Sequence, residues 1–190
     1  MIHLKNNDMK DKDQIAVFDT NIFLTGIDIN IFKNIIYTTP NVIEEVKASK
    51  YMVKNRNILN KIYAAIESKK LRIRNPNVKF IQDVTKKSKI TGDLYALSNI
   101  DKELIALTLE LSKNYHQKVK LYTNDYSIEN VCSELNISYT SLYKDGIEKK
   151  IIWEVFCPNC KTIHKAEDLN KFCEICGLKL KRRPKNNIIY

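Results

Sequence analysis

The chain has 190 residues, of which 44% are hydrophobic and 28% charged, close to the usage of an ordinary globular protein. Its formal net charge of +10 favours a polyanionic partner such as nucleic acid. No apolar run approaches the ~18 residues of a membrane span, and the mixed charges of the first fourteen residues are unlike a secretory signal. We therefore expect an intracellular, cytoplasmic protein that does not contact membranes.

The predicted elements alternate between strands and helices. A short apolar run at 15–18 indicates a buried strand, and Thr39-Pro40 then opens a helix as N-cap and first helical residue. The remaining patterns predict helices at 53–69, 78–90, 101–115 and 125–135, and strands at 71–74, 119–123 and 137–140. This alternation predicts an α/β fold with a mostly parallel sheet that is covered on both faces.

Acidic residues follow two of the predicted strands. VFDTN puts Asp19 just past the first strand, and LYTND puts Asp125 just past a later one. Ligands of open α/β sheets bind beyond the carboxyl ends of the strands, so both carboxylates should lie at one edge. Asp101 continues the apolar stripe of its own helix. Each acid could instead cap a helix, and Ser98-x-x-Asp101 resembles a capping box.

Helical geometry separates two neighbouring glutamates. At about 100° per residue, Glu45 falls at the rim of the apolar face of its helix and Glu44 points to water. We therefore expect one oxygen-rich site made by four carboxylates, Asp19, Glu45, Asp101 and Asp125. Such ligands suit one or two Mg²⁺ or Mn²⁺ ions, which beside a basic surface would support phosphodiester hydrolysis. Asn21 and Thr123 could orient ligands or water, although Asn21 could simply cap the following turn.

Two cysteine pairs mark the C-terminal part of the chain. They are separated by twelve residues, in the pattern Cys157-Pro-Asn-Cys160 and Cys173-Glu-Ile-Cys176. This spacing predicts one structural, tetrahedral zinc ion, with a redox dithiol as the alternative. A segment of ~40 residues cannot build a sufficient core, so the metal would supply its folding energy. The polar stretch KDGIEKK precedes it, and we expect two domains, 1–147 and 148–190.

A basic run follows the second cysteine pair. Its five cations are Lys179, Lys181, Arg182, Arg183 and Lys185. Next to a zinc ribbon, we interpret them as a clamp on RNA phosphates that positions the RNA without reading its sequence; a solvated tail is the alternative. Trp153 and Phe156 could stack on unpaired bases, or pack between the ribbon and the main domain.

Four acidic blocks of the sequence resemble those of a PIN-domain nuclease: VFDTN, TPNVIEEVK, TGDLYALSNIDKELIAL and LYTNDYSIENV. With the CxxC…CxxCG ribbon they are similar to the Nob (Nin-one-binding) endoribonucleases, over about residues 15–183. The resemblance implies a PIN-like three-layer α/β/α sandwich. It also implies a Mg²⁺- or Mn²⁺-dependent cut that matures the 3′ end of small-subunit ribosomal RNA in a pre-ribosomal particle.

The same resemblance places catalysis on the four carboxylates that the spacing already favours: Asp19, Glu45, Asp101 and Asp125. Asp93, in the TGD block, is either an auxiliary acid or a turn residue. Asn124 stands where a second Asp would be typical, so a fully acidic pair is absent there. The short form, a PIN domain plus a ribbon, suggests an archaeal member.

Two other functions remain open on the sequence. A toxin-type PIN ribonuclease would use the same chemistry on tRNA or mRNA, although such toxins usually lack a ribbon. An RNA-binding ribosome assembly factor would keep the carboxylates without cutting. Cleavage of an authentic ribosomal RNA precursor distinguishes these functions from the leading one.

Overall fold

The computed structural model describes residues 14–48, 52–115, 118–142 and 151–185. The first three of these ranges contain, in chain order, β1 (Gln14–Phe18), α1 (Thr20–Leu24), β2 (Ile36–Thr38), α2 (Pro40–Ala48), α3 (Met52–Glu67), β3 (Leu71–Ile73), α4 (Val78–Thr91), α5 (Asn99–Asn114), β4 (Lys118–Tyr122), α6 (Tyr126–Glu134) and β5 (Ser138–Thr140). The last range contains β6 (Trp153–Phe156), β7 (Ile163–His164) and β8 (Lys181–Pro184). The domain boundary expected at 147/148 lies outside the described residues.

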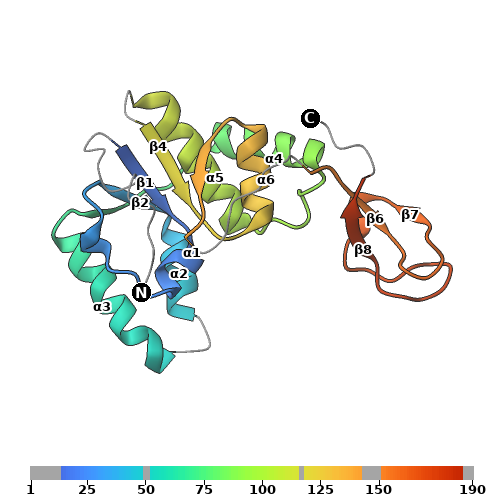
Figure 1. Cartoon of the computed structure of the whole chain (residues 1–190), viewed down its shortest axis with the longest axis horizontal. Coiled ribbons are helices and arrows are strands. Elements are labelled where there is room, and N and C mark those ends of the chain that lie inside the picture. Colours follow the sequence, from blue (N-terminus) through green and yellow to red (C-terminus); the bar gives the residue numbers. More distant parts are fainter. Residues whose placement is uncertain (1–13, 49–51, 116–117, 143–150, 186–190) are drawn as a thin grey trace.

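The first eleven elements form an α/β domain around a parallel sheet. Its five strands have the order β3-β2-β1-β4-β5, and every neighbouring pair is parallel. The chain therefore builds outward from β1 in one direction and from β4 in the other. Because such crossovers are right-handed, α1–α3 and α4–α6 cover opposite faces, and Figure 1 shows these two groups on either side of the strands. The predicted PIN-like α/β/α architecture is confirmed.

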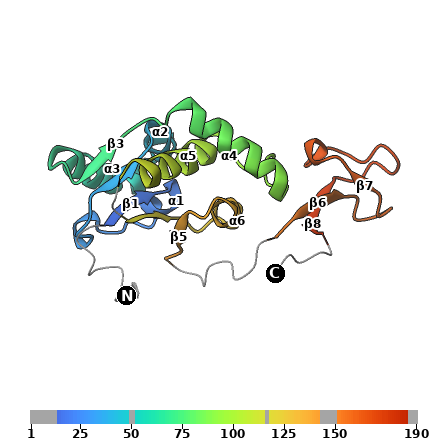
Figure 2. The same cartoon turned by 90° about the horizontal axis from the view of Figure 1, so that it is seen from above.

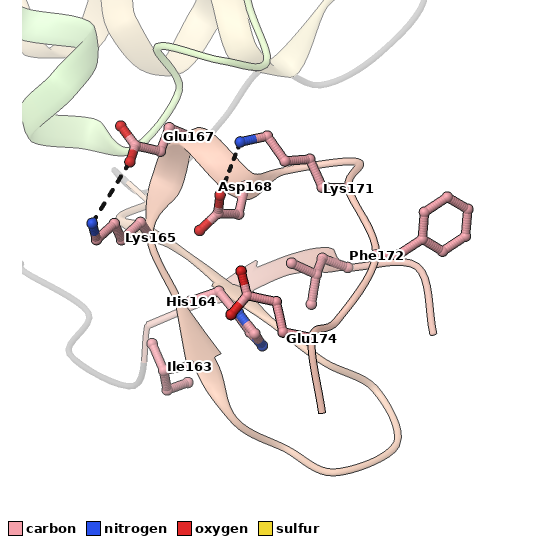
Figure 3. A pocket seen from close by; sticks show the side chains of 9 residues that line it. Ile163, His164, Lys165, Glu167, Asp168, Lys171, Phe172 and Glu174 are labelled. Carbon is pink, nitrogen blue, oxygen red and sulfur yellow. Dashed lines mark hydrogen bonds and ion pairs between the residues drawn. The ribbon is translucent and has the colours of Figure 1, made fainter. Parts of the chain in front are cut away.

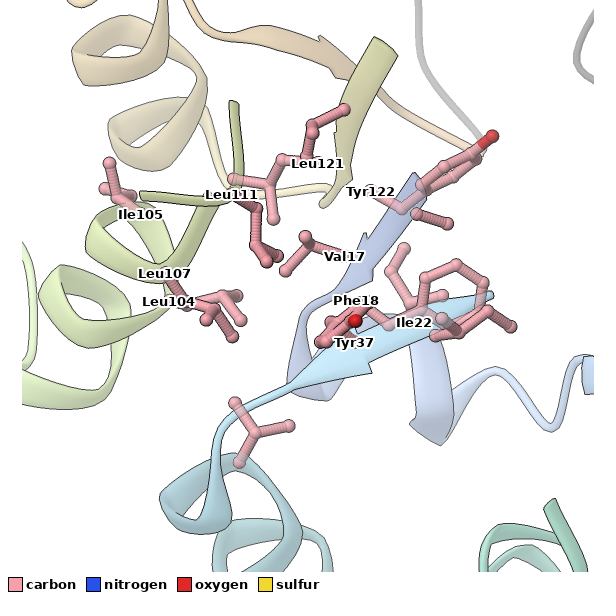
Figure 4. Close-up of a cluster of buried hydrophobic side chains, with 14 of the residues drawn as sticks. Val17, Phe18, Ile22, Tyr37, Leu104, Ile105, Leu107, Leu111, Leu121 and Tyr122 are labelled. Carbon is pink, nitrogen blue, oxygen red and sulfur yellow. The ribbon is translucent and has the colours of Figure 1, made fainter. Parts of the chain in front are cut away.

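The hydrophobic core fills both faces of the central strand β1. All five of its residues are buried, as expected for a parallel strand with helices on both sides. Successive side chains point to opposite faces. Figure 4 shows Val17 on the side of Leu107 and Leu111 of α5, while Phe18 lies on the side of Ile22. There its ring meets that of Tyr122 with centroids 5.2 Å apart.

The three remaining strands form a small antiparallel sheet with the order β7-β6-β8, which we call the ribbon. Its own core is small and comprises Val155, Cys157, Cys173 and Leu180. Figures 1 and 2 both show the ribbon beside α4 and α6, away from α3. Within the described ranges, no helix combines the length and the apolar character needed to cross a membrane.

Candidate active site and metal centres

Asp19 and Asp125 follow the two strands at which the sheet reverses its order. The last paired residues of β1 and β4 are Phe18 and Tyr122, so the two carboxyl ends are level. The backbone N–H of Asp19 donates to the carbonyl of Tyr122 at 3.2 Å, which carries the pairing one residue further. From here the chain continues to β2 on one side and to β5 on the other. This switch point is where open α/β sheets bind ligands.

Asp19 is the most buried of the four candidate acids, with 4% of its surface exposed. Its carboxylate accepts hydrogen bonds from the backbone N–H of Thr20 at 2.6 Å, from Asn21 Nδ2 at 2.7 Å and from Thr123 Oγ1 at 2.7 Å. Burial, together with the smaller effect of the nearby charges of Asp101 and Asp125, nevertheless raises the pKa of Asp19 to about 7. A carboxylate in these surroundings is stabilised by a cation.

Two threonine hydroxyls connect Asp19 to the acids on either side. Thr123 Oγ1, which donates to Asp19, also accepts from the backbone N–H of Asp125 at 3.1 Å. Thr20 Oγ1 donates to Glu45 Oε2 at 2.5 Å and so brings α2 to the site. Thr123 was predicted from the sequence as an orienting residue, whereas Thr20 was not. The only sequence feature that could have indicated Thr20 is a hydroxyl residue directly after the Asp that follows a strand.

Asp101 caps its helix, which is one of the two roles that the sequence left open, and it also lies near other acids. Its side chain accepts from the backbone N–H of Ser98 at 2.7 Å, and Ser98 Oγ accepts from the backbone N–H of Asp101 at 3.1 Å, which completes a capping box at the start of α5. Burial raises the pKa of Asp101, and the charges of Asp125 and Glu45 add to the effect. Asp101 therefore lies within electrostatic reach of the other acids while it caps its helix.

Glu44, the neighbour of Glu45, points away from this edge, as helical geometry predicted. It pairs with Lys47 at 2.7 Å, and 65% of its side chain is exposed. Asn124 is also directed elsewhere, because its Oδ1 accepts from Ser141 Oγ at 2.7 Å and from the backbone N–H of Leu142 at 3.1 Å. Asn124 thus fixes the segment after β5.

The residues present fit a divalent cation with oxygen ligands. The carboxylates lie further apart than the cysteines of the ribbon. Among the described residues, no three acidic side chains bring their ligand atoms within 4.8 Å of one another. Mg²⁺ suits such a site, since it commonly keeps several waters and takes only one or two carboxylates. Asn21 Oδ1 is buried without a hydrogen-bond partner in the described part of the chain, and it adds an acceptor next to Asp19.

Asp93 does not join the other acids through any of these contacts. It is fully buried, and its carboxylate accepts from Asn130 Nδ2 at 2.6 Å and from Arg182 Nη1 at 2.8 Å. Burial raises the pKa of Asp93, an effect that these hydrogen bonds and the Arg182 charge oppose. The structure thus places Asp93 at the contact between the larger domain and the ribbon.

The four cysteines of the ribbon gather into one site. All four sulfur atoms lie within 4.8 Å of one another, with Cys157 and Cys176 at 3.3 Å and Cys160 and Cys173 at 3.6 Å. The backbone N–H of Leu178 is the largest of the effects that lower the pKa of Cys176 to about 6, which favours the thiolate that binds metal. Four sulfur ligands complete a tetrahedral shell, so this site is structural in character.

The five cations after the second cysteine pair do not share one environment. Three of them are exposed: Lys179, Lys181 and Lys185. Arg183 pairs with Glu154 at 2.8 Å and lies over the ring of Phe156, with Cζ 4.5 Å from its centroid. Arg182 points to the larger domain. Arg182 differs from Lys181 and Arg183 of β8 because neighbouring side chains of a strand point to opposite faces.

A hollow of about 430 Å³ lies on the opposite, β7 side of the ribbon (Figure 3). Three acids and two lysines line it. The lysines already have partners, since Lys165 lies 3.9 Å from Glu167 and Lys171 lies 3.0 Å from Asp168. Glu174 adds a further negative charge. The hollow is therefore poorly suited to phosphate, and the β8 side is the better candidate for RNA.

Comparisons with known proteins agree with this geometry. The family described as "PIN domain of ribonuclease" matches residues 16–111. Endoribonuclease Nob1 of Methanocaldococcus jannaschii is 34% identical over 170 residues, which cover 90% of this chain and 78% of that protein. This chain belongs to the Nob1 family of PIN-domain endoribonucleases. Endoribonuclease Nob1 of Pyrococcus abyssi is 31% identical, over 89% of this chain and 93% of the relative.

Membership in the Nob1 family makes the protein an endoribonuclease with an RNA substrate. The PIN match includes α2 and most of β1 and α5, and these elements carry or adjoin three of the four candidate acids. A relative with another name, Ribonuclease VapC1 of Thermoplasma acidophilum, is 30% identical over 88% of this chain and 77% of its own length.

Proposed function

We propose that this protein is a metal-dependent endoribonuclease that cuts precursor ribosomal RNA at the 3′ end of the small-subunit rRNA. It would act in the cytoplasm of an archaeal cell, on the pre-ribosomal particle. The observation that carries this proposal is the gathering of acids at the β1/β4 switch point in a Nob1-family chain. The formal charge of +10 supports an RNA partner.

In the proposed reaction the acids at this edge hold Mg²⁺ or Mn²⁺. Asp19 would be the central ligand, and Glu45, Asp101 and Asp125 would bind the ion either directly or through the waters that it keeps. A bound ion would supply an activated water for in-line attack on the phosphodiester and would stabilise the leaving oxygen. Thr20 and Thr123 fix the carboxylates by hydrogen bonds, and Asn21 donates to the same oxygen of Asp19 as Thr123 does. Orientation of this kind maintains the geometry and affinity of a metal site.

The ribbon would hold the RNA while the larger domain cuts it. A zinc ion on the four cysteines would fold residues 151–185, whose core is small. The exposed lysines on and beside β8, Lys179, Lys181 and Lys185, would contact phosphates. Such phosphate contacts do not depend on the RNA sequence. The position of the cut would therefore be set by the geometry of the protein.

The direct test uses the purified full-length protein, Mn²⁺ and an end-labelled RNA that spans the 3′ junction of the small-subunit rRNA. We expect one cut at the junction, abolished by Asp19→Asn with RNA binding retained. An intact junction RNA under conditions where the protein binds it would contradict the proposal and favour a non-cleaving assembly factor.

A ribonuclease acting on other RNAs is the second candidate, because one relative is named Ribonuclease VapC1. The same assay separates the two functions when tRNA and mRNA are included at equal concentrations. A higher kcat/KM on tRNA or mRNA than on the junction RNA would favour the second candidate.

A further inference from the structure

Arg182 of β8 is the centre of the contact between the ribbon and the larger domain. Its Nη1 donates to Asp93 at 2.8 Å and its Nη2 to Ser127 Oγ at 2.9 Å, while its guanidinium lies over the ring of Trp153, with Cζ 4.3 Å from the centroid. The side chain of Asp93 is completely buried. A buried carboxylate without its cation is strongly unfavourable, so this ion pair opposes separation of the two parts.

Asn130 of α6 joins the same contact. Its Nδ2 donates to Asp93 at 2.6 Å and to the carbonyl of Ile151 at 2.6 Å, and its Oδ1 accepts from the backbone N–H of Ile151 at 2.9 Å. One buried amide therefore satisfies both backbone groups of the residue that precedes the ribbon strands. A surface that stays exposed to water would not require a buried amide at this position.

Gly92 shows independently that the two parts are fitted to each other. It ends α4 with φ +77°, and a Cβ at this position would lie 2.5 Å from the backbone oxygen of Trp153. Gly26 has a similar φ of +73°, but a Cβ there would meet nothing within 4 Å. The tight fit at Gly92 is therefore a property of the ribbon contact and not of the backbone conformation.

The contact also reaches the acidic edge. Ser127, which accepts from Arg182, donates its backbone N–H to Asp125 Oδ1 at 2.7 Å. The guanidinium of the ribbon is thus separated from a candidate metal ligand by a single residue of the first turn of α6. The position of the ribbon and the position of this acid are fixed by neighbouring hydrogen bonds.

We propose that Arg182, Asp93 and Asn130 form a latch that holds the ribbon at a set distance from the acidic edge, and that this distance selects which phosphodiester bond is cut. The inference rests on the proposed function, in which the ribbon holds RNA and the acids cut it. These three residues are positioning residues. Lys181 and Lys185 remain exposed when the latch is closed, so the ribbon can be docked and hold RNA at once.

The experiment opens the latch without touching an acid or an exposed lysine. Gly92→Asn introduces a residue type that tolerates the left-handed conformation, but its Cβ collides with the ribbon. Gly26→Asn is the matched control, with the same backbone change and open space. The full-length, zinc-loaded proteins are compared on the junction RNA and on a short RNA that reaches only the acidic edge.

We expect Gly92→Asn to cut the short RNA at the wild-type rate. On the junction RNA its single cut should spread to neighbouring bonds, and kcat/KM at the original bond should fall by about tenfold or more, because small displacements of reacting groups reduce rates up to about 10²-fold. Gly26→Asn should match the wild type on both RNAs. Arg182→Lys, which cannot reach both partners with a planar fork, should broaden the cut in the same way.

Two results separate the possible failures. If Gly92→Asn and Arg182→Lys both retain one cut at the wild-type position, the latch does not select the bond. If the wild type cuts neither RNA, the proposed nuclease function is wrong, and the selecting role of the latch is wrong with it.

Discussion

Replacing Asp19 by Asn should change how the stability of the metal-free protein depends on pH. The pKa of Asp19 is raised to about 7 from the ordinary value of 3.8, mainly by burial. Between these two values the folded protein keeps a proton that the unfolded chain has released. The stabilisation from this group is therefore complete below about pH 4 and is lost as the pH rises towards 7.

The size of this effect follows from the shift. Within that window each pH unit lowers the free energy of unfolding by about 1.4 kcal/mol, so the change from pH 5 to pH 7 is about 2–3 kcal/mol. Asn cannot ionise and lacks this dependence. It also loses some of the hydrogen bonds that Asp19 accepts, at about 1 kcal/mol each, but that loss is present at both pH values and cancels in the comparison.

The measurement is urea unfolding followed by far-UV circular dichroism at pH 5, 6 and 7, with zinc retained and no other divalent ion added. Glu44→Gln is the control, since Glu44 is exposed and faces away from the site. Adding Mn²⁺ at pH 7 should stabilise the wild type more than Asp19→Asn, because only the wild type has its central ligand. If the wild type and Asp19→Asn lose stability in parallel from pH 5 to pH 7, the electrostatic description of the site is wrong.

Three further predictions concern the hydroxyl network, the ribbon metal and the basic strand. Thr123→Val removes a donor to Asp19 and should reduce the cleavage rate about 10–100-fold with RNA binding unchanged. The control Thr108→Val, in a helix, should leave the cleavage rate unchanged. Equal cleavage rates of Thr123→Val and the wild type would show that Thr123 has no role in the site. Zinc removal should make residues 151–185 protease-sensitive while the larger domain stays folded, and uniform resistance with and without zinc would count against a metal-dependent ribbon. Lys181→Ala should lower the salt-dependence slope of RNA binding by about 0.7, the value for one phosphate contact on a single strand; an unaltered slope would show that Lys181 touches no phosphate.

Local patterns were sufficient for most of the main sheet. β1 was predicted as a short apolar run, and β4 from strand-like residues that alternate with lysines; each ends at a polar cluster. The parallel α/β prediction that follows from the alternation of strands and helices is confirmed. β2 was not predicted; it is defined by its pairing with β1 and β3, which no local pattern reports. The five-residue helix α1 was too short to show a period.

The candidate site was predictable to the extent that strand ends determine it. Asp19 and Asp125 could be placed together because adjacent parallel strands end at one edge, and Glu45 because helical geometry turns it towards that edge. The contact between Asp93 and Arg182 joins residues 89 positions apart and depends on how the ribbon docks. No local pattern reports such a contact. The sequence therefore offered Asp93 only as an auxiliary acid or a turn residue, and Arg182 as one cation of a phosphate clamp or a solvated tail.

The most direct test of the central claim is the rate of Mn²⁺-dependent cleavage by Asp125→Asn on the junction RNA. Asp125 caps α6 by accepting from the backbone N–H of Ser127 at 2.7 Å, and Asn caps helices about as well as Asp, so the fold should be retained. If the acids at this edge hold the catalytic ion, the variant will bind the RNA with wild-type affinity and leave it uncut. Cleavage at the wild-type rate would contradict the assignment of the active site.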